Sequence, residues 1–468
     1  MIKQIIGAIS KYKYEITLFL GSAIYTLYFT VATFLKHDNF YTGRYDLGNM
    51  DQTVWNTIHG RIFQLTDPSV SRLAAHSDFI LILLSPLYLI WEDPKMLLLI
   101  QSLVLGFGGI FVYAIAWKIL KNKLIALIFA FAFYINPAVN FTNLFDFHSV
   151  TLATTFFLGA FYFLIQKKYI PMLIFLVLAG ITKEQVWAIT ALFGAYLFLF
   201  NKQRKLGVLI FAVSVLIFYY LIWHAIPNAR GGEAHFAIEY YSDFGETPSE
   251  ITKNIIFHPL ETLRTLFQKE QMDYLRQLFL PMGYLSVFSP LILVFAAPDL
   301  LINLLSQNSQ LHQIYYQYSA TITPFIFITA ILGIKKINEM FPFVGKGSLV
   351  IATLLFSLLA QDSYGPLPFS NKPQDEMFKK PRENREVIKS ALSQIPKNAS
   401  VSASNNIGAH LSQRQKIYTI PEGIGITDYV AIYLSKDEKT QQSFKKVSED
   451  GHYVLIFSNK TFYMFRKF

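Results

Sequence analysis

The sequence contains no cysteine and few charged residues. Without cysteine, the chain of 468 residues has no disulfide, no thiol nucleophile and no cysteine-based metal site. Charged residues make up only 15% of the chain, whereas a soluble protein carries about 25%. The motifs G-x-x-x-x-G-K-[ST], G-x-S-x-G and H-E-x-x-H are also absent. Their absence argues against a P-loop pump, a serine hydrolase and a zincin.

Long apolar runs dominate the chain instead. Hydrophobic residues make up 53% of it, and many runs approach the length of about 20 residues with which a helix crosses a bilayer. We therefore predict an all-α polytopic membrane protein with about 9–12 transmembrane helices. The most regular runs are at 16–35, 97–117, 124–140, 149–165, 169–182, 186–200, 207–223, 318–334 and 343–360.

Two further apolar stretches are irregular. Residues 79–91 form a short run that contains Pro86, and residues 278–305 are interrupted by three prolines. Proline removes a helical hydrogen bond, so interrupted stretches at membrane depth usually line a cavity or lie inside the protein. We expect that 79–91 does not cross fully, and that 278–305 is re-entrant or makes two short crossings.

Basic clusters between the runs predict the orientation. Much of the net charge of +10 lies in these short loops, where lysine and arginine mark the cytoplasmic side, and it does not indicate a nucleic-acid partner. We expect a multi-pass plasma-membrane protein with a cytoplasmic N-terminus. The clusters are the N-terminus, Lys118/Lys121/Lys123, Lys167/Lys168, Lys202/Arg204/Lys205 and Lys335/Lys336.

This orientation gathers the polar segments on one external face. They are loop 36–78, the region of Asp146 and His148, the turn at Lys183–Glu184, loop 224–274, residues 306–317 and the tail. We divide the chain into a membrane domain (1–360), a linker (361–380) and a small extracytoplasmic α/β domain (381–468). In the last, Arg382–Gln394 has a helical pattern and four short stretches have strand patterns.

Loop 36–78 holds the first candidate site residues. The stretch begins at Arg44, a candidate for substrate binding, and contains Asp46 and Asp51, which a helix would separate by about 140°. Only one of the two is therefore expected to face a site, as a general base or metal ligand, while the alternative for Asp46 is a helix N-cap. Four further residues suit either an anionic ligand or lipid headgroups: His59, Arg61, Arg72 and His76.

Further candidates lie at the ends of later runs. Asp146 and His148 form either part of a metal site or helix caps. Lys183 and Glu184 lie either in a solvated turn or in a cavity. The remaining candidates are His312, Tyr316 and Tyr318, which would form a wall for a sugar or lipid phosphate, or part of the interfacial tyrosine belt.

Several ordered blocks resemble domain-of-unknown-function family 2079, a family of polytopic membrane proteins. The resemblance covers most of residues 15–435 and is weakest in loop 224–274 and the last thirty residues. The blocks are "YDLGNMDQTVWNTIHGR", "AHSDFILILLSPLYLIW", "LIQSLVLG", "FDFHSVTLA", "TKEQVWA", "APDLLINLLS", "YSATITPFIFITA" and "IPKNASVSASNNIGAHLSQRQKIYTIP".

That family resembles the GT-C glycosyltransferases, which include protein mannosyltransferases and aminoarabinose transferases. The resemblance implies transfer of a sugar from a polyprenyl-phosphate donor to a lipid, glycan or protein acceptor at the external face. By position Asp46 corresponds to the catalytic acid of the first loop, while the second acid of that loop has no clear counterpart because Leu47 follows Asp46.

The resemblance also implies roles for other candidates. Arg61, Arg72, Lys183 or His312 would stabilise the departing phosphate. Asp146, His148 and Glu184 would shape the sugar pocket, or Asp46, Asp146 and His148 would bind a divalent ion such as Mg or Mn. Two alternatives come from other functional classes: a transporter or lipid flippase, and a non-catalytic membrane assembly protein.

Overall fold

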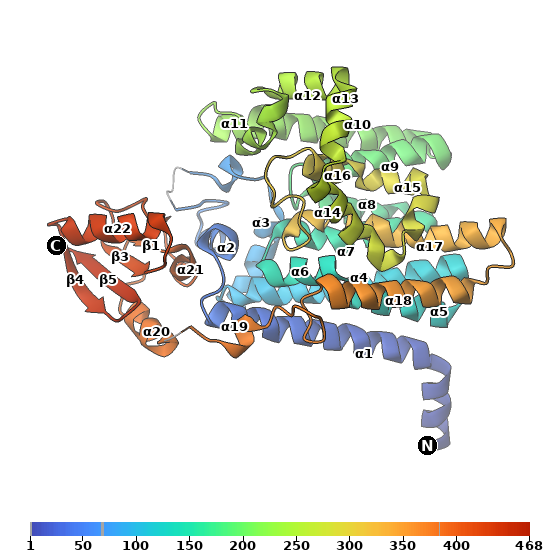
Figure 1. Cartoon of the computed structure of the whole chain (residues 1–468), viewed down its shortest axis with the longest axis horizontal. Helices are drawn as coiled ribbons and strands as arrows, with labels where there is room; N and C mark the ends of the chain where they lie inside the picture. The colour runs from blue at the N-terminus through green and yellow to red at the C-terminus, as the bar shows by residue number, and fades with distance from the viewer. Residues whose placement is uncertain (1, 67–69, 383) are drawn as a thin grey trace.

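A helical bundle and a small C-terminal sheet domain form the molecule. The computed structural model describes residues 2–66, 70–382 and 384–468. In Figure 1 the main helices run along the long axis, and the sheet domain extends beyond one end of the bundle. The N-terminus lies toward the other end. The predicted class, a polytopic helical membrane protein with a small C-terminal α/β domain, is confirmed.

Within the described residues, four helices are long and apolar enough to span a membrane. Lys11–Asp38 belongs to α1 (Ile2–Asp38), which is kinked at Tyr12. The other three spans are α4 (Lys95–Leu120), Arg204–Ala229, which joins α10 (Arg204–Tyr220) to η5 (Leu221–Ala225) and α11 (Ile226–Ala229), and α18 (Lys346–Tyr364). Only 22% of the most apolar window of Arg204–Ala229 is buried, so this helix presents most of its apolar surface outward, as a lipid-facing helix does.

A bent pair of helices forms a fifth candidate span. α5 (Lys123–Tyr134) and α6 (Pro137–Phe145) meet at an angle of 43°. Asn136 caps α6 by accepting a hydrogen bond from the Val139 N–H at 3.2 Å, and Pro137 occupies the first turn, where its missing N–H costs nothing. The bend directs Phe145, Asp146 and His148 toward the end of the bundle that carries the sheet domain.

The other predicted spans form shorter helices. A helix of 12 residues such as α8 is about 18 Å long, well short of about 30 Å of hydrocarbon, so the number of full-length spans is smaller than the number of apolar runs. The 10 apolar residues Ile80–Leu89, in α3 (Ile80–Leu84) and η3 (Ser85–Leu89), are shorter still. The remaining short apolar helices are η4 (Ser149–Leu152), α7 (Ala153–Ile165), α8 (Tyr169–Gly180), α9 (Val186–Phe200), α15 (Pro290–Leu293), η9 (Val294–Ala296) and α16 (Ala297–Leu304). α17 (Thr323–Met340) is longer, with 18 residues.

Short polar and amphipathic helices connect these elements. In α12 a capping box is formed by Thr247 and Glu250, which satisfies the first free amides of the helix. The connecting helices are η1 (Arg44–Gly48), α2 (Asn49–Ile58), η2 (Arg72–Ala74), η6 (Phe236–Phe244), α12 (Pro248–Phe257), α13 (Pro259–Leu266), α14 (Lys269–Phe279), η7 (Leu280–Met282), η8 (Leu285–Phe288), η10 (Gln317–Ser319) and α19 (Glu376–Lys379).

The C-terminal domain contains a five-stranded mixed sheet of order β2-β1-β3-β5-β4. β1 pairs in parallel with β2 and β3, while β5 pairs antiparallel with β3 and β4. Two helices of the domain, α21 and α22, were not expected from the sequence. The elements are α20 (Arg385–Ser393), β1 (Val401–Ala403), α21 (Asn405–Gly408), β2 (Ile417–Thr419), β3 (Tyr429–Tyr433), α22 (Glu438–Glu449), β4 (Tyr453–Ser458) and β5 (Phe462–Lys467).

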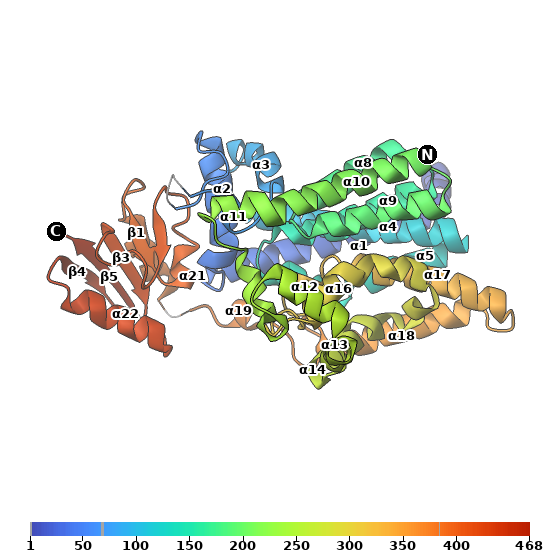
Figure 2. The ribbon, with the colours of Figure 1, turned by 90° about the horizontal axis from the view of Figure 1, so that it is seen from above.

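Loop 36–78 connects the bundle to the sheet domain. The Gln52 side chain in α2 donates to the Arg414 carbonyl at 2.8 Å, and Thr66 donates to the Ile417 carbonyl at 2.7 Å. In Figure 2, α2 and α21 lie where the two parts meet. This junction places loop 36–78, the end of α6 and the sheet domain next to one another.

Candidate functional site

Asp46 lies on η1, a single turn of π-helix that follows the extended residue Gly43. Its Oδ1 is 3.2 Å from Nε2 of His148, and its side chain is 31% exposed. His148 comes from the turn after α6 and is mostly buried. The imidazole therefore orients a carboxylate that is still open to solvent, which is the arrangement that a general base requires.

Asp146 occupies the neighbouring position but is buried. Its Oδ1 is 2.7 Å from Nζ of Lys36, and its Oδ2 accepts the Gly43 N–H at 2.8 Å. Lys36 also donates to the carbonyls of Leu144 and Phe145. The ammonium group thus compensates the negative charge of Asp146 and fixes the backbone from which His148 extends.

A cavity of about 710 Å³ opens beside Asp46. Lys36, Asp46 and Asp146 line it on the bundle side, and Asn405 and Asn406 of α21 line it on the sheet-domain side. Aromatic and charged side chains complete the wall: Phe40, Tyr41, Phe145, Tyr315, Lys372, Glu376 and Arg382. Aromatic faces, amides and cations around one carboxylate can hold a sugar together with an anionic group.

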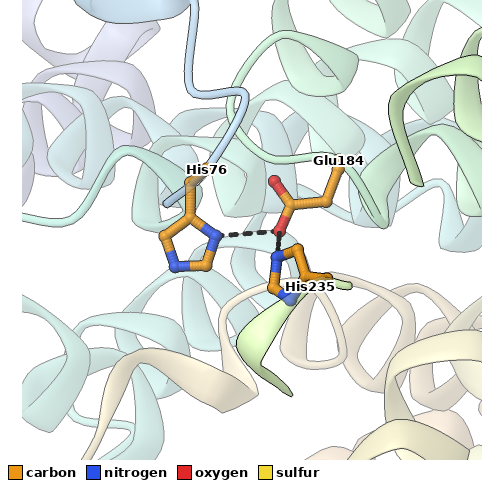
Figure 3. A group of neighbouring side chains, drawn as sticks. All are labelled: His76, Glu184 and His235. Carbon is orange, nitrogen blue, oxygen red and sulfur yellow. Dashed lines mark hydrogen bonds and ion pairs between the residues drawn. The ribbon is translucent and has the colours of Figure 1, made fainter. Parts of the chain in front are cut away.

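A second cavity, of about 250 Å³, is lined only by residues of the bundle. Its wall includes His76, Lys183, Glu184, His235 and Tyr318. His76 Nδ1 is 2.8 Å from Oε1 of Glu184, and His235 Nε2 is 3.3 Å from the same oxygen (Figure 3). Burial lowers the pKa of His76 to about 4, so this imidazole is neutral at pH 7.

Seven of the predicted site residues line neither of these two cavities; His148 and Tyr316 contact residues of the large-cavity wall, and the other five lie elsewhere. Arg72 makes a buried, two-pronged ion pair with Asp78, with nitrogen–oxygen distances of 3.0 and 2.9 Å. Arg61 stacks on Trp55, and His312 lies 3.2 Å from Glu270. The remaining two, Arg44 and Asp51, are buried at the junction with the sheet domain.

The other predicted residues gather in two groups. Asp46, Asp146 and His148 meet beside the large cavity, and Tyr316 packs against Phe145 next to them. His76, Lys183, Glu184 and Tyr318 meet in the small cavity. Segments far apart in sequence therefore converge at one end of the bundle, the same segments that the basic clusters predict to share a face.

The predicted metal set does not assemble. Among the described residues, Asp46, Asp146 and His148 do not bring ligand atoms within 4.8 Å of one another as a group, because Lys36 holds Asp146. A different set does so: His76, Glu184 and His235.

Sequence reasoning missed several residues of both cavities. Lys36 was missed because a lysine at the end of a span is also typical of an interfacial anchor. His235 lies in the loop that resembles the family least, without a neighbouring ligand in sequence. Asn405, Asn406 and Arg382 were missed because only the docking of the sheet domain brings them to the cavity.

Comparisons with known proteins agree with this architecture. The family model described as "Predicted membrane protein (DUF2079)" matches residues 36–459. No curated protein matches the chain. Among solved structures, ArnT from Cupriavidus metallidurans bound to undecaprenyl phosphate is similar, with a TM-score of 0.58 and 8% identity over 95% of this chain and 97% of that one. This likeness shows that the chain shares the fold of that protein.

A more distant likeness is to archaeal oligosaccharyltransferase AglB from Archaeoglobus fulgidus in complex with an inhibitory peptide and a dolichol-phosphate. It has a TM-score of 0.41 and 12% identity, over 91% of this chain and 70% of that one.

Proposed function

The chain belongs to the DUF2079 family of predicted membrane proteins, and from this premise we propose that it is a membrane glycosyltransferase. It transfers a sugar from a polyprenyl-phosphate donor to a lipid, glycan or protein acceptor. The observation that carries the proposal is the pairing of Asp46 with His148 beside the large cavity, on a GT-C fold. The bound undecaprenyl phosphate of ArnT supports a lipid-linked donor.

Asp46 is the catalytic residue of this proposal. Its carboxylate accepts the proton of the acceptor hydroxyl or amine, or orients that group, while His148 positions the carboxylate. The acceptor attacks the anomeric carbon, and the bond between that carbon and the phosphate oxygen breaks. The departing polyprenyl phosphate gains negative charge and needs nearby cations, for which Arg382 and Lys372 on the cavity wall are suited.

The reaction takes place on the extracytoplasmic side of the plasma membrane. This orientation rests on the basic clusters, which place the N-terminus in the cytoplasm and the sheet domain outside. In this orientation the membrane domain comprises residues 1–360, the linker residues 361–380 and the extracytoplasmic domain residues 381–468.

Transfer by purified protein tests the function directly. The protein is placed in lipid nanodiscs with a panel of radiolabelled polyprenyl-phosphate sugars, and sugar release to water or acceptor is measured. We expect Asp46→Asn to abolish turnover while donor binding persists, because the amide is a poor base. Asp273→Asn, at a half-exposed carboxylate on α14, is the control and is expected to retain turnover.

Two outcomes would contradict the proposal. Unchanged turnover in Asp46→Asn would remove Asp46 from the reaction. Failure of the wild-type protein to bind any donor of the panel would favour the transporter or the assembly protein instead.

A further inference from the structure

The small cavity contains a group of side chains that the proposed sugar transfer does not use. His76 ends the first polar loop, Glu184 lies in the turn between α8 and α9, and His235 precedes η6 (Figure 3). The possible ligand atoms of these three side chains all lie within 4.8 Å of one another. Three segments far apart in the sequence therefore place two imidazoles and one carboxylate around one point.

The spacing suits a shared metal ion. Zinc binds histidine nitrogen and carboxylate oxygen at about 2.0–2.2 Å, which separates neighbouring ligand atoms of a tetrahedral site by about 3.3 Å. The distance between Glu184 Oε1 and His235 Nε2 is 3.3 Å, and that between Glu184 Oε1 and His76 Nδ1 is 2.8 Å. Both distances are close to this separation, and the ligand atoms of all three residues lie within 4.8 Å of one another.

His235 provides an independent indication of a ligand. Its side chain is 7% exposed, and its Nε2 lacks a well-formed hydrogen bond although it points toward Glu184. A buried polar atom without a well-formed hydrogen bond is unfavourable, so its retention calls for an explanation. A metal ion between the ring and the carboxylate supplies one.

The surroundings hold the ligands in place, as the outer partners of metal ligands do. The second oxygen of Glu184 accepts the Ser77 N–H at 3.1 Å and lies 3.4 Å from the Ser77 hydroxyl. The ring of His235 stacks on Phe236 with 4.7 Å between centroids. Its Nδ1 accepts the Ala237 N–H at 3.1 Å, so the neutral ring carries its proton on Nε2. Coordination through Nε2 would move that proton to Nδ1 and replace this hydrogen bond by a metal–nitrogen bond.

From these observations we propose that His76, Glu184 and His235 bind a zinc ion. Two nitrogens and one carboxylate favour zinc over magnesium, which prefers oxygen ligands. All three residues line the small cavity, so a fourth position is open to water or ligand from that cavity.

The ion would cross-link the segment before η6 to the bundle. Gly231 and Gly232 precede His235 and have φ angles of +74° and +100°, a left-handed conformation that glycine adopts freely. These residues would let the segment fold back over the cavity, and the ion would hold it there. This proposal is independent of the sugar-transfer proposal, since it concerns another cavity and needs no turnover.

The lack of native cysteine allows a sharp test. In full-length, tag-free protein, His235→Cys introduces one thiol that can replace the imidazole as a zinc ligand. We expect saturating Zn²⁺ to slow alkylation of this thiol about tenfold or more, because a coordinated thiolate is not free to react. The control is His258→Cys, at an exposed position of the same loop, where Zn²⁺ is expected to leave the rate unchanged.

Metal analysis of the same preparations completes the test. After equilibration with Zn²⁺ and dialysis, wild type and His258→Cys are expected to retain one zinc per chain, and His235→Ala and Glu184→Gln to retain much less. An alkylation rate in His235→Cys that Zn²⁺ leaves unchanged, or equal zinc retention in all variants, would overturn the proposal. A cooperative thermal transition in each variant separates loss of the site from failure to fold.

Discussion

Lys36 and Asp146 show how single residues support the larger cavity. Both side chains are nearly fully buried, and their charged groups are 2.7 Å apart. Removing both charges from water costs several kcal/mol, which only good geometry and further hydrogen bonds repay. Lys36 donates to backbone carbonyls at the end of α6, and Asp146 accepts from Gly43, so the pair joins the end of α1 to the turn that carries His148.

This pairing predicts strong coupling between the two residues. We expect Lys36→Met to destabilise the protein by about 3–5 kcal/mol, because it leaves a buried carboxylate without its partner. Combining it with Asp146→Asn should restore part of that loss. Denaturant unfolding in detergent of the wild type, both single variants and the double variant measures the coupling free energy. Additive effects of the two changes would contradict the buried ion pair.

A single site residue can be predicted from the sequence when its neighbours in the chain form a recognisable pattern. Asp46 and His148 stand near other ionisable residues at the ends of apolar runs, so both were candidates before the structure. His235 and Lys36 lie outside the quoted sequence blocks, although within the residues 36–459 that the family model matches. Their partners are more than 50 residues away in each case: Glu184 for His235, Asp146 for Lys36. No local pattern encodes a contact of that kind.

At the scale of one element, α2 joins the bundle to the sheet domain. Its Asp51 is fully buried and accepts hydrogen bonds from Ser412 at 2.6 Å, Tyr88 at 2.6 Å and Gln413 at 3.1 Å. Burial raises the pKa of this carboxyl from 3.8 to about 6, although the hydrogen bonds oppose the rise. The sequence predicted that Asp46 and Asp51 point in different directions, and the structure gives Asp51 a role in docking.

The raised pKa predicts a pH dependence of stability. Between pH 3.8 and about 6 the folded protein keeps a proton on Asp51 that the unfolded chain has lost. The protonated Asp51 therefore adds about 3 kcal/mol to the free energy of unfolding below pH 3.8. This contribution is lost as the pH rises from 3.8 through about 6. We expect Asp51→Asn to flatten this part of the stability profile, measured by denaturant unfolding between pH 4 and 7. An identical pH profile in both proteins would contradict the assignment.

The positions of the helices could be predicted from the sequence, but not whether each helix crosses the membrane. Apolar runs located α7, α8 and α9 well, but their lengths of 13, 12 and 15 residues are below a full bilayer crossing. Hydropathy reports that a segment avoids water and does not distinguish lipid from the protein interior. α22 was missed because most of its surface is exposed and polar. Only Val447 and a few small side chains of this helix are buried.

For the whole molecule, the decisive feature is the docking of the sheet domain on the end of the bundle. Phe40, from the end of α1, is fully buried in the core of the sheet domain, against residues such as Ile388 and Phe462. His410 of that domain stacks on His37 and packs at a tilt against Phe40, with 4.1 Å between ring centroids in each pair. The large cavity lies at this junction, so its wall is complete only when the two parts are docked. The sequence predicted both parts but not this contact.

Phe40→Ala tests whether docking is needed to complete the cavity. Emptying a buried phenylalanine site costs about 3–5 kcal/mol, so we expect the sheet domain to detach and the linker around 366–380 to become sensitive to limited proteolysis. Phe369→Ala, at a side chain 59% exposed in the same linker, is the matched control and is expected to leave the digestion pattern unchanged.

If the proposed function holds, donor turnover should fall in Phe40→Ala together with the loss of protection from proteolysis, because Asn405 and Asn406 leave the cavity wall. Detachment with full turnover would instead place the reaction entirely within the bundle.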